Sequence, residues 1–115
     1  MPTSIRRFET GATRDTAEGK LDYEAFLSPL VLRRYAEYLH KHRIQPDGQE
    51  RPGDNWQKGI PPAVYMKSWW RHFMDCWLHH RGWTCATDPE ESLCAALFNN
   101  MGLLHERLAE KESAL

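Results

Sequence analysis

Apolar residues recur at helical spacing in three long segments of the chain, and polar or breaker-rich stretches separate these segments. The first segment begins at Ser28, whose hydroxyl suits an N-cap, and at Pro29, which fits a first helical position because no N–H is needed there. The pattern predicts a helix over residues 30–42. Basic residues crowd its last turn, where positive charge stabilises the free carbonyl groups.

The second segment predicts a helix from about Pro62 to His80, with Gly82 as its stop. One broad arc of this helix is apolar, and we expect that arc to form the core. Its members are Met66, Trp69, Trp70, Phe73, Met74 and Trp77. A polar stripe lies opposite, made of Ser68, His72, Asp75, Cys76 and His79.

The third segment has the clearest helix start in the chain. Asp88 is a candidate N-cap, Pro89 the first helical position and Glu91 the capping-box partner, and the helix is expected to run to about Glu112. Apolar residues along it follow a three-four spacing, which predicts a packing seam. They are Cys94, Leu97, Met101, Leu104 and Leu108.

The segments outside these helices are polar or rich in glycine and proline. Residues 1–27 read as an extended arm, with a few apolar side chains that could anchor it to the core. These anchors are Leu21, Tyr23, Phe26 and Leu27. Residues 44–62 read as a linker, in which Trp56 either fastens the loop to the core or covers a binding pocket.

We found no strand pattern and no repeat. The sequence therefore predicts one domain over residues 1–115 in the all-α class. The expected architecture is a small helical bundle of about three main helices over residues 28–115, with a long N-terminal arm over residues 1–27 and a loop-rich linker.

Composition narrows the function classes. Lys and Arg number 15 against 16 Asp and Glu, so the balance argues against binding to duplex nucleic acid or to an anionic membrane. No stretch approaches the roughly 18 apolar residues of a membrane helix, and the N-terminus lacks the apolar region of a signal peptide. Three cysteines at spacings of nine fit no common zinc pattern, and reduced thiols in the cytoplasm are the simplest interpretation. Five tryptophans leave more apolar surface than a monomer of this size hides, which predicts a homo-oligomer.

Two pairs of metal-binding side chains stand three residues apart on predicted helices. Glu37 and His40 form one pair, and His72 and Asp75 form the other. Residues at this spacing share a helix face and can bind one divalent cation, as Glu and His pairs do in helical bundles. The alternative for each pair is an ordinary surface ion pair with a neighbour.

Basic residues in the arm and the linker suggest an anion site. If both segments fold over the second helix, Arg14, Lys20 and Lys58 converge with Arg71 on an anionic group such as a triphosphate. Either Trp56 or Tyr23 could then stack on a purine. The alternative is solvated charge on loops.

Several short sequence motifs, taken together and in order, resemble the N-terminal domain of phage dATP/dGTP diphosphohydrolases, over residues 11–108. These motifs are Gly11-Ala12-x-Arg14-Asp15, Gly19-Lys20-x-Asp22-Tyr23, Ser28-Pro29, Asp54-Asn55-Trp56-x-Lys58-Gly59, Arg71-His72 and Phe98-Asn99. The resemblance implies an enzyme related to the all-α, MazG-like pyrophosphohydrolases. Such enzymes cleave the α–β bond of a purine deoxynucleoside triphosphate and use Mg²⁺ or Mn²⁺ to activate water.

Lys20, Lys58, Arg71 and His72 match positions that the family keeps. In the enzyme hypothesis, His72 and its helix neighbour Asp75 would be the catalytic metal ligands, while Lys20, Lys58 and Arg71 would hold phosphates. Asn55 and Trp56 match further positions that the family keeps, with Trp56 expected over the base. The protein would then act in the cytoplasm of an infected host cell.

Two other functions stay open. The chain lacks the Glu-Glu-x-x-Glu word of MazG-like metal sites and the histidine pair of the last helix, yet it keeps the basic and aromatic positions. This combination favours a non-catalytic protein that binds a nucleotide, or sequesters a nucleotide-derived signal against host defence. The third hypothesis is a bundle that only binds a protein partner.

Overall fold

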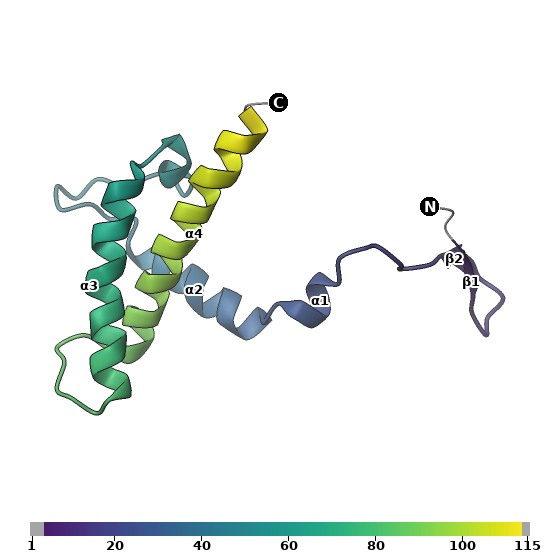
Figure 1. Cartoon of the computed structure of the whole chain (residues 1–115), viewed down its shortest axis with the longest axis horizontal. Helices are drawn as coiled ribbons and strands as arrows, with labels where there is room; N and C mark the ends of the chain where they lie inside the picture. Colours follow the sequence, from purple (N-terminus) through teal and green to yellow (C-terminus); the bar gives the residue numbers. More distant parts are fainter. Residues whose placement is uncertain (1–3, 114–115) are drawn as a thin grey trace.

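A computed structural model describes residues 4–113 of the chain, and Figure 1 shows its elements. In chain order they are β1 (Ile5–Arg7), β2 (Thr13–Asp15), α1 (Tyr23–Phe26), α2 (Pro29–Lys41), the 3₁₀ turn η1 (Asn55–Lys58), α3 (Pro62–His80) and α4 (Pro89–Ser113). The longest helices, α3 and α4, pack against each other, and α2 crosses α4. None of the described helices has the length and apolar character that a membrane crossing needs.

The prediction of an all-α fold is wrong. The chain is mostly helical, at 59%, but β1 and β2 form a two-stranded antiparallel sheet in which Arg6 pairs with Arg14. Backbone bonds close the hairpin, for example from the Phe8 amide to the Ala12 carbonyl at 2.9 Å, and Gly11 supplies the turn with a φ of 89°. All side chains of both strands are exposed, so the alternation of apolar and polar residues that marks a half-buried strand is missing.

The predicted anchoring of the arm is also wrong. A short helix, α1, starts where Asp22 accepts a hydrogen bond from the Ala25 amide at 3.0 Å, and its apolar side chains point into solvent. Figure 1 shows the hairpin and α1 extending away from the other helices, which gives the molecule a length of 58 Å. Leu21, Tyr23, Phe26 and Leu27 are all exposed.

The predicted limits of the three long helices are confirmed. Ser28 Oγ accepts a hydrogen bond from the Val31 amide at 3.2 Å at the start of α2. The α3 helix spans the expected residues, and Gly82, with a φ of 77°, follows its end. Asp88 accepts hydrogen bonds from the Glu90 and Glu91 amides at 3.0 and 3.1 Å at the start of α4. These ends are set by local chemistry, which is visible in the sequence.

The face of α3 that packs against α4 is not the predicted one. The expected core arc is exposed at Met66, Trp70, Phe73, Met74 and Trp77, and only its Trp69 is half-buried. The polar stripe is half-buried throughout. It continues the side of α3 that carries Tyr65, a fully buried residue that lies against Gly102 of α4.

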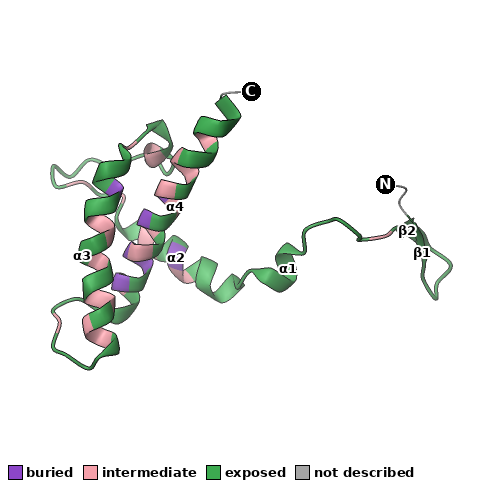
Figure 2. Cartoon of the chain, in the orientation of Figure 1, coloured by how far each residue is buried: buried purple, intermediate pink, exposed green. Residues whose placement is uncertain are grey.

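Small and polar side chains explain this orientation. The buried residues of α4 are Ser92, Cys94, Ala95, Asn99 and Gly102 (Figure 2). Four of these five differ from the predicted packing seam, whose Leu97, Leu104 and Leu108 are exposed. Side chains this small let two helix backbones approach closely, whereas tryptophans would hold them apart.

Candidate functional site

The arm places its three candidate binding residues far from α3. Arg14 lies in β2, and Tyr23 is the first residue of α1. Lys20 ends a turn in which its amide donates a hydrogen bond to the Ala17 carbonyl at 3.0 Å. All three side chains are exposed. The arm therefore does not fold over α3 within one chain, and these residues do not converge with Arg71 (Figure 1).

The Asn-Trp-x-Lys motif of the linker forms the 3₁₀ turn η1, which packs against the C-terminal half of α4. The Trp56 ring lies edge-on to the His105 ring, with centroids 4.6 Å apart and an interplanar angle of 77°. The Ile60 amide donates to Glu106 at 3.4 Å just after the turn. Asn55 and Trp56 are half-buried, and Lys58 is exposed. Trp56 thus fastens the linker to α4 and keeps part of its indole accessible.

The candidate catalytic residues of α3 lie on the side that faces α4 and α2. His72 and Asp75 are both half-buried, and Arg71 beside them is exposed. Burial lowers the pKa of His72, the nearby Asp75 carboxylate opposes this, and the positive charges of Arg71 and His42 add to the lowering. His72 is therefore a neutral imidazole near pH 7, which is the form that can accept a proton or ligate a metal.

Glu37 and His40 of α2 each lie next to an arginine side chain. Glu37 lies 4.0 Å from Arg33, one helical turn earlier, and both side chains are exposed. An Nη2 atom of Arg43 lies 3.3 Å from His40 Nε2. Glu37 is thus in a surface ion pair, and His40 has a guanidinium within hydrogen-bond distance.

A cluster at the end of α2 was not anticipated. The centroids of the Tyr38 and His42 rings lie 4.3 Å apart. His42 is close enough to His72 to help lower its pKa, and the Glu91 carboxylate helps raise the pKa of Tyr38. A hydrogen bond from Lys41 lowers the pKa of Glu91 in the first turn of α4, and this carboxylate does not form the predicted capping-box bond. The basic residues in the last turn of α2 were interpreted only as helix-end charge, and no local pattern shows that they meet α3 and α4.

A second polar group joins the end of α3 to the start of α4. Thr87 Oγ1 lies 2.7 Å from Ser92 Oγ, 3.2 Å from Cys85 Sγ and 3.4 Å from His79 Nε2. Burial raises the pKa of the nearby Cys76 thiol, so this thiol stays protonated. The three cysteines are free, as predicted. The group closes the α3–α4 turn by hydrogen bonds.

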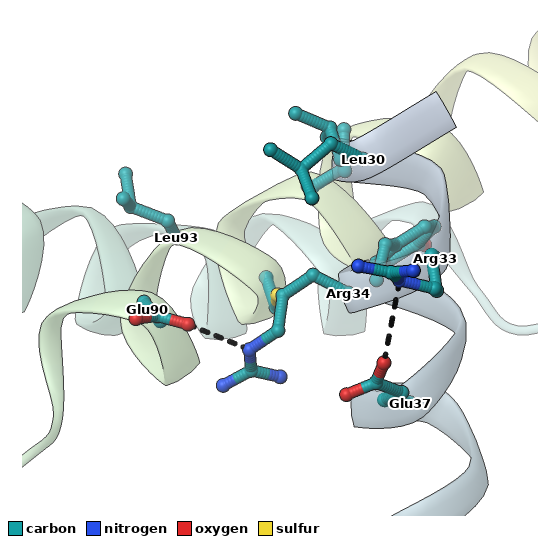
Figure 3. A pocket seen from close by; sticks show the side chains of 10 residues that line it. Leu30, Arg33, Arg34, Glu37, Glu90 and Leu93 are labelled. Carbon is teal, nitrogen blue, oxygen red and sulfur yellow. Dashed lines mark hydrogen bonds and ion pairs between the residues drawn. The ribbon is translucent and has the colours of Figure 1, made fainter. Parts of the chain in front are cut away.

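An apolar groove of about 510 Å³ lies between α2 and α4. Figure 3 shows Leu30 of α2 and Leu93 of α4 across this groove, with charged side chains at its edge. There Arg34 donates to Glu90 at 2.7 Å. None of the candidate binding residues lines it except Glu37.

Within one chain, the donor set does not fit the metal that the resemblance implies. His72 and Asp75 supply two ligands, and among residues 4–113 no group of three or more His, Cys, Asp or Glu side chains is placed to hold a metal ion. A Mg²⁺ ion prefers oxygen donors in an octahedral arrangement, so one imidazole and one carboxylate are too few. The geometry instead presents an aromatic residue beside an exposed lysine on η1, a separate basic residue on α3 and further basic residues on the arm.

Comparison with known proteins adds no relative: no family model matches this chain, and neither a curated protein nor a solved structure is significantly similar to it.

Proposed function

We propose that this chain binds a purine nucleotide. The observation that supports the proposal is the arrangement of η1, where Trp56 is held in place by His105 and stays partly accessible beside the exposed Lys58. A fixed aromatic ring offers a stacking surface to a base, and a nearby ammonium group attracts phosphate. The same residues belong to the word that resembles the phage dATP/dGTP diphosphohydrolase domain.

The experiment is calorimetric titration of the full chain with dATP and dGTP, compared with dCTP and dTTP. Purine nucleotides are expected to bind more tightly because their larger rings stack over more of the indole. Since stacking on an aromatic residue contributes about 1–3 kcal/mol, Trp56→Ala is expected to weaken binding roughly 5- to 150-fold.

Matched variants keep this test interpretable. Trp83→Ala removes a tryptophan that is exposed, follows α3 and lies outside η1, so it is expected to leave binding unchanged. Trp56→Phe keeps a stacking ring and is expected to bind more tightly than Trp56→Ala. A wild-type chain that is helical by circular dichroism and binds no purine nucleotide would contradict the proposal.

Hydrolysis to the nucleoside monophosphate and pyrophosphate is the second candidate function. It is favoured by the lowered pKa of His72, a neutral imidazole one helical turn from Asp75. Because no third His, Cys, Asp or Glu side chain joins this pair among residues 4–113, the proposal includes no metal-bound step. Incubation of dATP and dGTP with the protein, with and without Mn²⁺, followed by chromatography, separates the two functions. Intact recovered nucleotide supports a sequestering protein, and released pyrophosphate supports the enzyme.

The proposed setting is the cytoplasm of an infected host cell. A nucleotide-binding protein there has access to the deoxynucleotide pool and to nucleotide-derived signals. The near-balance of 15 basic and 16 acidic residues is compatible with this, because a local phosphate site needs only a few basic side chains.

A further inference from the structure

The outer side of α3 carries an apolar surface that has no partner among residues 4–113. Trp70, Phe73 and Trp77 are 54%, 39% and 47% exposed, and Met66, one turn before Trp70, and Met74, directly after Phe73, are also exposed. We call these five residues the α3 face. The rings contact one another, with the Trp70 and Phe73 centroids 6.1 Å apart. Clustered aromatic and methionine side chains of this kind are typical of protein interfaces.

The arm carries a second unpartnered apolar surface. Tyr23 and Phe26 are 65% and 77% exposed, and Leu21 and Leu27 are exposed beside them. We call these four residues the arm anchors. Three of them stand at positions i, i+3 and i+4 around α1, which places them on one side of that helical turn. Such spacing suits docking of a helical turn on an apolar surface.

The arm does not reach the α3 face of its own chain. Only Leu27 and Ser28 separate α1 from α2, and Ser28 is held as the N-cap of α2 by its bond to the Val31 amide. Figure 1 shows α1 and the hairpin on one side of α4 and α3 on the other. In this arrangement the arm anchors lie away from the α3 face of the same chain.

Charge complementarity points to the same pair of surfaces. Exposed basic residues flank the α3 face at Lys67, Arg71 and Arg81, and the Arg81 guanidinium lies 5.6 Å from the centroid of the Trp77 ring. Exposed acidic residues accompany the arm anchors at Glu18, Asp22 and Glu24, and they outnumber the single basic residue of this stretch, Lys20. An arm laid on this face would pair opposite charges around an apolar centre.

We propose that two copies of this chain exchange arms, so that the arm anchors of each copy cover the α3 face of the other. With about 150–250 Å² per aromatic side chain, the exposed parts of the five aromatic residues supply roughly 800–1,400 Å² over two reciprocal contacts. The two methionines and two leucines extend this area into the range of about 1,200–2,000 Å² that stable complexes bury. A two-fold pair satisfies both surfaces of both copies and leaves no contact open for further growth.

The exchange also brings together residues that stand apart in one chain. Lys20 directly precedes the arm anchors, and Arg71 directly follows Trp70 of the α3 face. If the docked arm sets Leu21 beside Trp70, Lys20 of one copy lies near Arg71 of the other, and a phosphate group bound between them would offset the repulsion of the two positive charges. This consequence rests on the proposed function, whereas the exchange itself rests only on the apolar surfaces and their charges.

Sedimentation equilibrium of the full chain at micromolar concentration tests the exchange. The wild type is expected to be a dimer, and Trp70→Glu and Phe26→Asp are each expected to be monomers. Both side chains are exposed in the single chain, so circular dichroism is expected to be unchanged. If Trp70→Glu loses helical signal, Met74→Glu on the same face replaces it. Trp83→Glu, an exposed tryptophan outside the face, is the matched control and is expected to remain a dimer.

Mixing the two variants distinguishes exchange from face-to-face pairing. A mixed pair keeps one intact contact, between the arm of the Trp70→Glu chain and the face of the Phe26→Asp chain. The mixture is therefore expected to contain more dimer than either variant alone. A monomeric wild type, a Phe26→Asp variant as dimeric as the wild type, or a mixture with no gain would each overturn the exchange.

Nucleotide binding supplies the separate test of the shared site. Lys20→Ala and Arg71→Ala are expected to stay dimeric and to weaken dATP binding, and mixing them is expected to restore a fraction of intact sites. A mixture with no recovery would overturn the role of Lys20 across the dimer. A dimer that binds no nucleotide would overturn the proposed function and leave the exchange supported.

Discussion

The contact between Tyr65 and Gly102 is the tightest point of the α3–α4 packing, and Gly102→Ala tests it directly. A Cβ atom at Gly102 would lie 2.2 Å from Tyr65 Cε1, 2.3 Å from Cζ and 2.7 Å from Oη. These distances are far below van der Waals contact. The phenol ring is fully buried, so it cannot turn into solvent, and the two helices must separate to admit the methyl group.

Two opposing effects set the size of the change. Alanine is more favourable than glycine inside a helix by about 1 kcal/mol, which alone would stabilise the variant. Overpacking of a filled interior costs about 1–3 kcal/mol, and a clash with a rigid buried ring lies at the upper end of that range. The expected net result is a loss of about 1–2 kcal/mol in the free energy of unfolding, or roughly 4–10 °C in Tm.

Thermal unfolding followed by circular dichroism measures this effect, at one fixed protein concentration because association changes the apparent stability. Gly53→Ala is the matched control, since a Cβ atom there meets nothing within 4 Å and its φ is not positive. The control is expected to stay within about 0.5 kcal/mol of the wild type. In a Tyr65→Leu background, Gly102→Ala is expected to cost less, because the clashing ring is gone. A Tm for Gly102→Ala at or above that of the wild type would refute the packing described here.

Three further predictions concern single side chains. Ser28→Ala removes the hydroxyl that caps α2 and is expected to lower the free energy of unfolding by about 1 kcal/mol in urea titration; an unchanged midpoint would contradict the role of the cap. Tyr65→Phe deletes a buried hydroxyl that has no hydrogen-bond partner within residues 4–113, so stability is expected to stay level or to rise by about 1 kcal/mol, and a clear loss would show a hidden partner. The pKa of His72 is lowered in the folded state, so its contribution to stability is present above the unfolded value of 6.5 and is lost as the pH falls through and below it. His72→Gln is therefore expected to reduce the decrease in Tm between pH 7.5 and pH 5.5, and an equally steep decrease would contradict the assignment.

Much of the secondary structure was predictable because helix ends depend on nearby residues. The hydroxyl of Ser28, the carboxylate of Asp88 and the prolines that follow them act within one helical turn, and the predicted limits of α2, α3 and α4 match the structure. The β hairpin was missed for the complementary reason. Its strands bury no side chain, so backbone hydrogen bonds and the Gly11 turn hold it without an apolar pattern.

The candidate site was predictable only in parts. Trp56 and Lys58 could be placed in one turn from the sequence, because they are only two positions apart along the chain. It could not show that Trp56 packs on His105, or that His42 of α2 comes near His72 of α3, because 49 and 30 residues separate these partners and their meeting depends on how the helices cross.

The sequence by itself determined where the long helices begin and end, and that α3 has one apolar and one polar side. Only the tertiary structure decided which side faces α4. Apolar residues usually turn inward. Here, however, Gly102, Ser92 and Ala95 give one face of α4 only small side chains, and the polar stripe of α3 packs closely on that face. The bulky Trp70 and Trp77 remain outside this close contact and are exposed. Burial is decided by how two surfaces fit together, and a single helix, however clear its pattern, contains only one of them.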